Sequence, residues 1–285
     1  MQNILLTSSA EHLAENLKKK GKNLNLVCLG KNKDNSRIFP DGEVYVKIPE
    51  IGKLKGKKVV VIHSGQPAPN EGLLELELAL QILKENSVEI EIFFTYFSYG
   101  MQDDIFEKGE SNFAKNLLNK FFAFYGVKKI FILDPHFGKR EWLNKYKITN
   151  VSAVPLLIEK AREDFGQDIL LLSADKGGKR RTGIAGADKK RTNSFDVKFL
   201  SCNINFEDKN VAVVDDLVET GGTLVKFRKL AKDSGAKKVV ALLTHGVLPE
   251  GIKKVKKSYD KLYLTNSINR KEANVDITDL ILENI

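Results

Sequence analysis

The chain has 285 residues, of which 42% are hydrophobic and 29% charged, as is usual for a globular protein of one or two domains. Its 46 Lys and Arg exceed its 37 Asp and Glu, and no apolar run approaches the roughly 20 residues needed to span a bilayer. The lysines are scattered at the ends of expected elements without interleaved aromatic residues, which favours anionic small molecules as ligands and argues against nucleic acid or a membrane as partner.

The first twenty residues predict a short strand and an amphipathic helix, with neither the cationic start nor the cleavage site of a signal peptide. Cys28 and Cys202 lie in apolar, strand-like segments and show no metal-ligand or disulfide spacing. We therefore expect reduced thiols and a cytoplasmic location.

Short β-branched runs alternate with amphipathic stretches along the rest of the chain. The expected strands are Lys58–His63, Val88–Thr95, Lys129–Leu133, Asp168–Ser173, Val211–Val214, Lys238–Thr244 and Lys261–Thr265. The expected helices are Asn70–Glu85, Ser111–Tyr125, Ala153–Asp164 and Thr223–Ser234. This alternation predicts an α/β fold with mostly parallel sheets, whose binding sites form at the carboxyl ends of the strands. Because the sets before and after residue 150 are comparable, we expect two domains, 1–150 and 151–285.

One expected strand runs directly into two carboxylates and a glycine turn, in the stretch "VAVVDDLVETGGTL" at 211–224. Backbone N–H groups at a glycine turn that opens a helix bind phosphate, and the helix dipole favours the anion. Adjacent carboxylates accept hydrogen bonds from vicinal hydroxyls, so the whole stretch predicts a site for a ribose 5-phosphate. Its candidate ligands are Asp215, Asp216, Thr220, Gly221, Gly222 and Thr223.

This stretch resembles the loop that binds phosphoribosyl pyrophosphate (PRPP) in type I phosphoribosyltransferases and in PRPP synthetases. Other motifs resemble the synthetases alone: "FPDGE" at 39–43, "YGMQDD" at 99–104, "DPH" at 134–136, "SADKGG" at 173–178, "ADKKR" at 187–191 and "THG" at 244–246. Their order and spacing agree over nearly the whole chain, so the sequence is identified as a member of the ribose-phosphate pyrophosphokinase family. The resemblance implies two tandem phosphoribosyltransferase-like domains, the first on the ATP side and the second carrying the ribose phosphate loop and a flexible catalytic loop.

The resemblance also implies the reaction, in which the β,γ-diphosphoryl group of MgATP passes to the 1-hydroxyl of ribose 5-phosphate and gives PRPP and AMP. The implied catalytic residues are Lys189, Arg191 and His136, with Mg²⁺ at His136 and Asp175. The implied ATP-binding residues are Phe39, Asp41, Glu43, Gln102 and Asp103. In this family the segment at 39–43 serves the ATP of a neighbouring subunit, so we expect a homodimer or a higher homo-oligomer.

The chain departs from the family pattern at Met101, Asp104, Glu219 and Gly221. The first two remove positive charge from one edge of the expected ATP site, where the family has an Arg and a second basic residue. Three interpretations follow: a synthetase in which another cation substitutes, a diphosphokinase with a larger acceptor such as ADP-ribose, or a non-catalytic paralogue. Retention of the implied catalytic and metal residues argues against the third.

Overall fold

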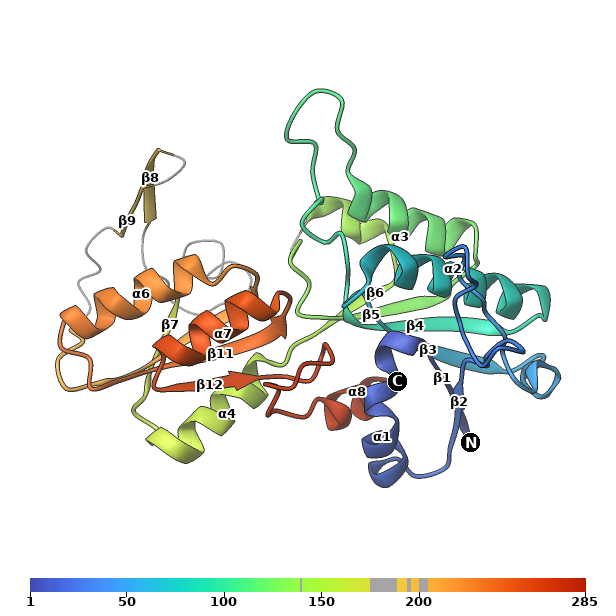
Figure 1. Cartoon of the computed structure of the whole chain (residues 1–285), viewed down its shortest axis with the longest axis horizontal. Coiled ribbons are helices and arrows are strands. Elements are labelled where there is room, and N and C mark those ends of the chain that lie inside the picture. The colour runs from blue at the N-terminus through green and yellow to red at the C-terminus, as the bar shows by residue number, and fades with distance from the viewer. Residues whose placement is uncertain (139, 175–188, 194–195, 200–204) are drawn as a thin grey trace. The chain divides into compact units, whose positions relative to one another are not determined.

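Figure 1 shows the computed structural model of the chain, which describes residues 1–138, 140–174, 189–193, 196–199 and 205–285. These residues form two compact units, Met1–Val151 together with Ile277–Ile285, and Ser152–Asp276. The expected boundary assigns the last residues to the second domain, but they belong to the first unit. The reason is local packing: α8 (Thr278–Asn284) lies against α1 (Ala14–Lys20), and Ile281 is fully buried.

The first unit contains a six-stranded parallel sheet in the order β2-β1-β3-β4-β5-β6. Its strands are β1 (Gln2–Leu6), β2 (Leu24–Cys28), β3 (Lys58–Ser64), β4 (Glu89–Tyr96), β5 (Lys129–Leu133) and β6 (Ile148–Val151). Its longer helices are α2 (Pro69–Glu85) and α3 (Phe113–Ala123), and short 3₁₀ segments cover Ser8–Leu13, Ile51–Leu54 and Glu141–Lys145. Figure 1 shows α2 and α3 on one face of the sheet and α1 and α8 on the other. Strands covered on both faces need nearly continuous apolar sequence, and β3 and β4 are accordingly buried after their first residue.

The second unit contains a four-stranded parallel sheet in the order β12-β11-β10-β7. Its strands are β7 (Leu170–Ser173), β10 (Asn210–Val218), β11 (Lys238–Gly246) and β12 (Lys261–Leu264), and its helices are α4 (Val154–Phe165), α6 (Gly222–Asp233) and α7 (Pro249–Ser258). Side chains alternate along β10: Val211 and Val213 pack with α6 and α7, whereas Ala212 and Val214 pack with α4. A separate antiparallel ribbon joins β8 (Lys189–Asn193) to β9 (Asp196–Phe199).

The predicted fold class is confirmed, because both units are parallel sheets flanked by helices. Two local expectations are wrong. The strand expected to end at Val214 continues to Val218, since it keeps pairing with β11. Residues 189–193, expected within a loop, form a strand because they pair with 196–199. Within the described ranges, every helix is too short or too polar to cross a bilayer.

Candidate active site

The predicted phosphate turn lies between β10 and α6, at the carboxyl edge of the second sheet. The chain leaves β10 at Val218, turns through Gly221 with φ +71°, and enters α6 at Gly222. In the described part of the chain no side chain caps this helix, and Thr220 and Gly222 are exposed. The first N–H groups of α6 therefore face solvent at a positive helix end, which is the arrangement that binds a phosphate.

Helix α7 supports this turn through backbone-to-backbone contact at two glycines. A Cβ at Gly251 would overlap the carbonyl oxygen of Glu219, and a Cβ at Gly221 would lie 3.0 Å from the carbonyl oxygen of Gly251. Any larger residue at position 251 would push the turn away from α7. Gly251 was not among the residues expected from the sequence, because the contact joins segments about thirty residues apart.

Two further side chains form hydrogen bonds to the backbone of segments next to the turn. Arg270 donates from Nε to the carbonyl oxygen of Gly246, at 2.9 Å, and from Nη2 to that of Val247. The Val247 N–H in turn donates to the carbonyl oxygen of Val218 at 2.9 Å, so the loop after β11 is bonded to the end of β10. Tyr259 donates its hydroxyl to the carbonyl oxygen of Leu224 in the first turn of α6, at 2.6 Å. The turn is thus part of a rigid framework.

Asp215 and Asp216 are buried within β10, with 8% and 2% of their surfaces exposed. Alternation places Asp215 on the face that packs with α6 and α7 and Asp216 on the face that packs with α4. The electrostatics agree with this placement, because burial and, to a smaller extent, the charge of Asp215 raise the pKa of Tyr259, which follows α7. The two carboxylates therefore flank the strand end from opposite faces.

In the first unit, the segment Asp134–His136 follows β5 at the carboxyl edge of its sheet. Asp134 has φ +36°, in the left-handed region that residues other than glycine rarely adopt. Its N–H donates to the carbonyl oxygen of Val151 at 2.8 Å, which fixes the direction in which the chain leaves the sheet. His136 is half-buried directly beyond this bend. Backbone strain of this kind is typical of functional sites.

The predicted ATP-binding pair Gln102 and Asp103 lies on a loop held by two other segments. The N–H of Ala114 donates to the carbonyl oxygen of Gln102 at 3.1 Å, and Asn112 Nδ2 donates to that of Asp103 at 2.6 Å. Arg140 donates from Nε to the buried carboxylate of Asp103 at 2.7 Å. The loop is therefore connected to the chain that follows His136.

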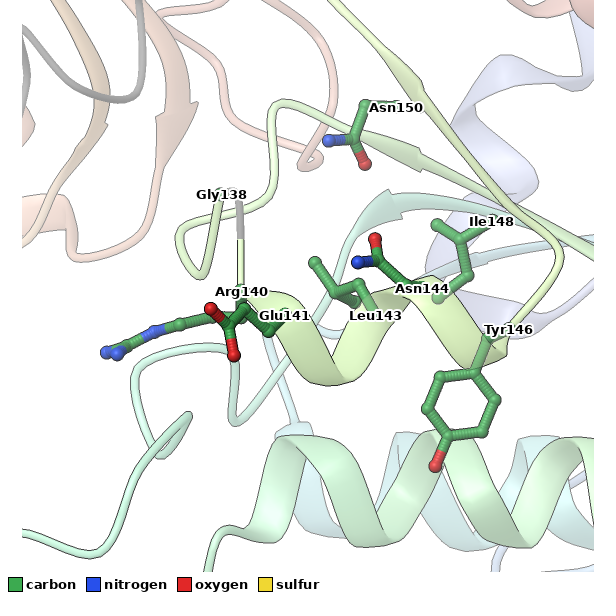
Figure 2. A pocket seen from close by; sticks show the side chains of 8 residues that line it. All are labelled: Gly138, Arg140, Glu141, Leu143, Asn144, Tyr146, Ile148 and Asn150. Carbon is green, nitrogen blue, oxygen red and sulfur yellow. The ribbon is translucent and has the colours of Figure 1, made fainter.

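Arg140 was not among the predicted site residues, although it is the cation that the acidic loop contacts. Its Nη1 also donates to Asp104 Oδ2 at 3.1 Å. In the sequence Arg140 is visible only as a basic residue shortly after "DPH". Its contact with Asp103 depends on the fold, which brings the two segments together. Arg140 also lines a cavity of about 530 Å³ together with Asn144 and Asn150, and Figure 2 shows its guanidinium extending away from these two side chains.

The segment at 39–43 forms a tight, exposed turn in the first unit. The N–H of Phe39 donates to the carbonyl oxygen of Glu43 at 2.8 Å, and the N–H of Glu43 donates to Asp41 Oδ1 at 3.1 Å. The Phe39 ring packs edge-on against Tyr45, with ring centroids 5.6 Å apart. The side chains of Phe39, Asp41 and Glu43 are all exposed, so this turn projects from its unit.

Three of the predicted residues are described only through their backbone or not at all. Asp175 lies outside the described residues. Lys189 and Arg191 are described through their backbone alone, which places them on β8 opposite Phe199 and Val197. In the part of the chain that is described, no group of three or more His, Cys, Asp or Glu side chains is arranged to hold a metal ion.

The chain is similar to known proteins over most of its length. The protein-family model for the N-terminal domain of ribose phosphate pyrophosphokinase matches residues 3–124. The chain is 30% identical to the ribose-phosphate pyrophosphokinase of Pyrococcus furiosus over 98% of its own length and 99% of that protein. It is 29% identical to the protein of the same name from Thermococcus kodakarensis, with the same coverage of 98% and 99%. The crystal structure of phosphoribosylpyrophosphate synthetase from Mycobacterium smegmatis matches with a TM-score of 0.82 at 21% identity, over 99% of this chain and 97% of that one, which shows a shared fold.

Proposed function

The chain is an enzyme of the ribose-phosphate pyrophosphokinase family, and we propose that it makes PRPP and AMP from ribose 5-phosphate and MgATP. The single observation that carries this proposal is the open N-terminus of α6, shortly after two buried carboxylates near the carboxyl end of β10. That arrangement offers a phosphate site and hydroxyl acceptors within a few residues of each other, which is what a ribose 5-phosphate presents.

In the proposed reaction the 1-hydroxyl oxygen of the acceptor attacks the β-phosphorus of ATP. A bond forms between that oxygen and the β-phosphorus, the bond from the β-phosphorus to the α,β-bridging oxygen breaks, and AMP leaves. The hydroxyl proton is lost to the surroundings. The N–H groups of the turn at 220–223 hold the 5-phosphate, and Asp215 and Asp216 accept hydrogen bonds from the ribose hydroxyls from the two faces of β10. Positioning of this kind contributes most of the catalysis in phosphoryl transfer.

The ATP side is proposed to use Gln102 and Asp103 of one subunit and Phe39, Asp41 and Glu43 of its neighbour. The exposed turn at 39–43 suits this role, and it makes a homodimer or larger homo-oligomer the proposed working unit. Lys189 and Arg191 would neutralise the negative charge that develops on the transferring group.

Mg²⁺ is the proposed metal, with His136 and Asp175 as its protein ligands and with phosphate oxygens as the others. The ion would neutralise charge on the triphosphate. Mg²⁺ prefers oxygen ligands and is commonly bound by one or two carboxylates plus substrate phosphates, so the Asp175 carboxylate and the triphosphate suit the ion. The half-buried His136 is an unusual ligand for it, and its proposed part in the site rests on the family resemblance. A cytoplasmic location is proposed with it.

A larger acceptor such as ADP-ribose is the second candidate. Of the two departures from the family pattern in the phosphate turn, only one still favours it. The glycine at 221 is explained by packing, because of its positive φ and its approach to Gly251. It therefore gives no evidence for a different acceptor. Glu219, half-buried in the turn, is the remaining departure that favours this alternative.

The test is AMP release from ATP and Mg²⁺ with ribose 5-phosphate, with ADP-ribose, or with no acceptor. We expect AMP with ribose 5-phosphate, with PRPP as the co-product. AMP with ADP-ribose alone would establish the second candidate, and no turnover with either would favour a binding paralogue. Lys189→Ala is the matched control, since it should lower kcat with little change in KM, whereas a contaminating kinase would be unaffected.

A further inference from the structure

The loop at 101–104 carries two carboxylates and no basic residue, and it lies at the edge of the proposed ATP site. Its sequence is Met-Gln-Asp-Asp, with Met101 39% exposed and Asp104 at the surface. A triphosphate is itself strongly anionic, and like charges within a few ångströms repel each other appreciably even near a protein surface. ATP binding at this loop therefore requires the two carboxylates to be compensated.

Arg140 is placed to compensate both of them. It binds Asp103 through Nε at 2.7 Å and Asp104 through Nη1 at 3.1 Å, so one guanidinium bridges the two acids. The charge on these carboxylates raises the pKa of Arg140, with the hydrogen bond to Asp103 as the largest cause. Such a pair of charge-assisted hydrogen bonds fixes the orientation of the guanidinium plane.

The guanidinium retains donors beyond those that the two acids use. A guanidinium has five N–H groups, and among the hydrogen bonds of the described residues Arg140 engages only Nε and Nη1. About a third of its side-chain surface, 35%, is exposed. The Nη2 group is therefore available to an incoming anion while the other two nitrogens hold the loop.

The backbone of the loop is also held by the start of α3. Asn112 is the N-cap of that helix, with its Oδ1 accepting from the N–H of Lys115, and its Nδ2 binds the carbonyl oxygen of Asp103. Removing Arg140 would leave these backbone contacts of the loop in place, while the buried Asp103 carboxylate would lose the cation that compensates it. This separates an electrostatic role for Arg140 from a purely structural one.

We propose that Arg140 is the cation that allows the acidic loop Gln102–Asp104 to accept MgATP, by neutralising Asp103 and Asp104 and by donating from Nη2 to the triphosphate. This inference deepens the proposed function and rests on ATP being the diphosphoryl donor. Arg140 would then supply the positive charge that the family pattern places at position 101, where this chain has a methionine.

The test measures binding of a non-hydrolysable ATP analogue with Mg²⁺ by calorimetry, together with KM for ATP and for ribose 5-phosphate. Arg140→Ala should weaken analogue binding about 10- to 150-fold, the range for a lost charge-assisted hydrogen bond, with KM for ribose 5-phosphate unchanged. Arg140→Lys should recover part of the loss, because it keeps the charge without the bridging geometry. Melting temperatures of all variants serve as the folding control.

The decisive arm is the double variant Arg140→Ala with Asp104→Asn. If the role is electrostatic, removing one of the two uncompensated carboxylates should restore analogue affinity by several-fold, which a lost structural contact would not do. Unchanged affinity in Arg140→Ala, or no recovery in the double variant, would overturn the inference and leave the proposed function intact. Failure of the wild-type enzyme to bind the analogue would overturn both.

Discussion

At the scale of single residues, Asp215 and Asp216 are neighbours in the chain but continue opposite faces of β10. In the proposed complex, a ribose at the carboxyl end of this strand would therefore be held from both faces. The pair is buried, so neither carboxylate is an ordinary solvated acid. Burial keeps water from competing for the hydroxyl hydrogen bonds.

We expect Asp215→Ala and Asp216→Ala each to raise KM for ribose 5-phosphate, because a lost hydrogen bond to a charged group is worth about 1.5–3 kcal/mol, or roughly 10- to 150-fold. Steady-state kinetics with MgATP at saturation measures this. Asp233→Ala is the control, since Asp233 is exposed at the other end of α6. An unchanged KM in both variants would remove these acids from the site.

His63 gives the first unit a dependence of stability on pH. It is buried against the Phe94 ring, its Nδ1 lies 3.0 Å from Thr7 Oγ1 and 3.5 Å from Ser9 Oγ, and burial lowers its pKa to about 3. The folded state keeps the ring neutral, whereas the unfolded chain takes up a proton near its ordinary pKa. Below about pH 6.5 the free energy of unfolding should fall by about 1.4 kcal/mol per pH unit, until about pH 3.

The measurement is urea unfolding at several pH values, followed through the fluorescence of Trp142, the single tryptophan, which lies in the same unit. His63→Gln should remove this part of the slope, because glutamine does not titrate. An identical slope in wild type and variant would show that other groups carry the acid sensitivity.

Most of the candidate site residues could be named from the sequence, because glycines, acids and threonines at fixed offsets carry their chemistry locally. Arg140 and Gly251 could not. Each acts on a residue more than thirty positions away, and its immediate sequence does not indicate which residue that is. Their roles depend on the distance between elements, which only the fold sets.

At the scale of elements, the phosphate turn and α7 form one packed unit because both contacts are backbone against backbone. Gly251→Ala would place a methyl group on the carbonyl oxygen of Glu219, so either the turn or the helix must shift. We expect KM for ribose 5-phosphate to rise at least tenfold, since a shift of about 1 Å in a positioning element can cost a factor of 100.

Gly52→Ala is the matched control for this variant, because a Cβ at Gly52 has no neighbour within 4 Å and it lies in the other unit. Kinetics at saturating ATP and melting temperature should be measured for both. If Gly251→Ala keeps the wild-type KM, the contact with α7 does not position the turn.

Some strands could be recognised from their hydrophobic sequence, and others could not. The continuous apolar runs of β3, β4 and β11 identified them, because parallel strands covered on both faces have no polar side. The far end of β10 and the strand β8 were missed. "DDLV" and "KKRTN" are too polar to indicate a strand, and each is a strand only because a partner pairs with it.

At the scale of the whole molecule, the chain returns to its first unit after completing the second. Alternating strands and helices predicted the fold class, but the return of α8 left no signal in composition, since the segment has no glycine- or proline-rich linker. We expect Ile281→Ala, a fully buried site in α8, to lower the free energy of unfolding reported by Trp142 by about 2–4 kcal/mol. Leu248→Ala, partly exposed in the second unit, should leave that transition unchanged, and the reverse pattern would contradict this assignment.

The central claim is diphosphoryl transfer, and ATP carrying a radioactive β-phosphate tests it most directly. In a single turnover with excess enzyme, Mg²⁺ and ribose 5-phosphate, we expect the label to move to a product that also contains the ribose, with unlabelled AMP released in equal amount. Label recovered in ADP or in free pyrophosphate, with the ribose 5-phosphate unchanged, would contradict the account.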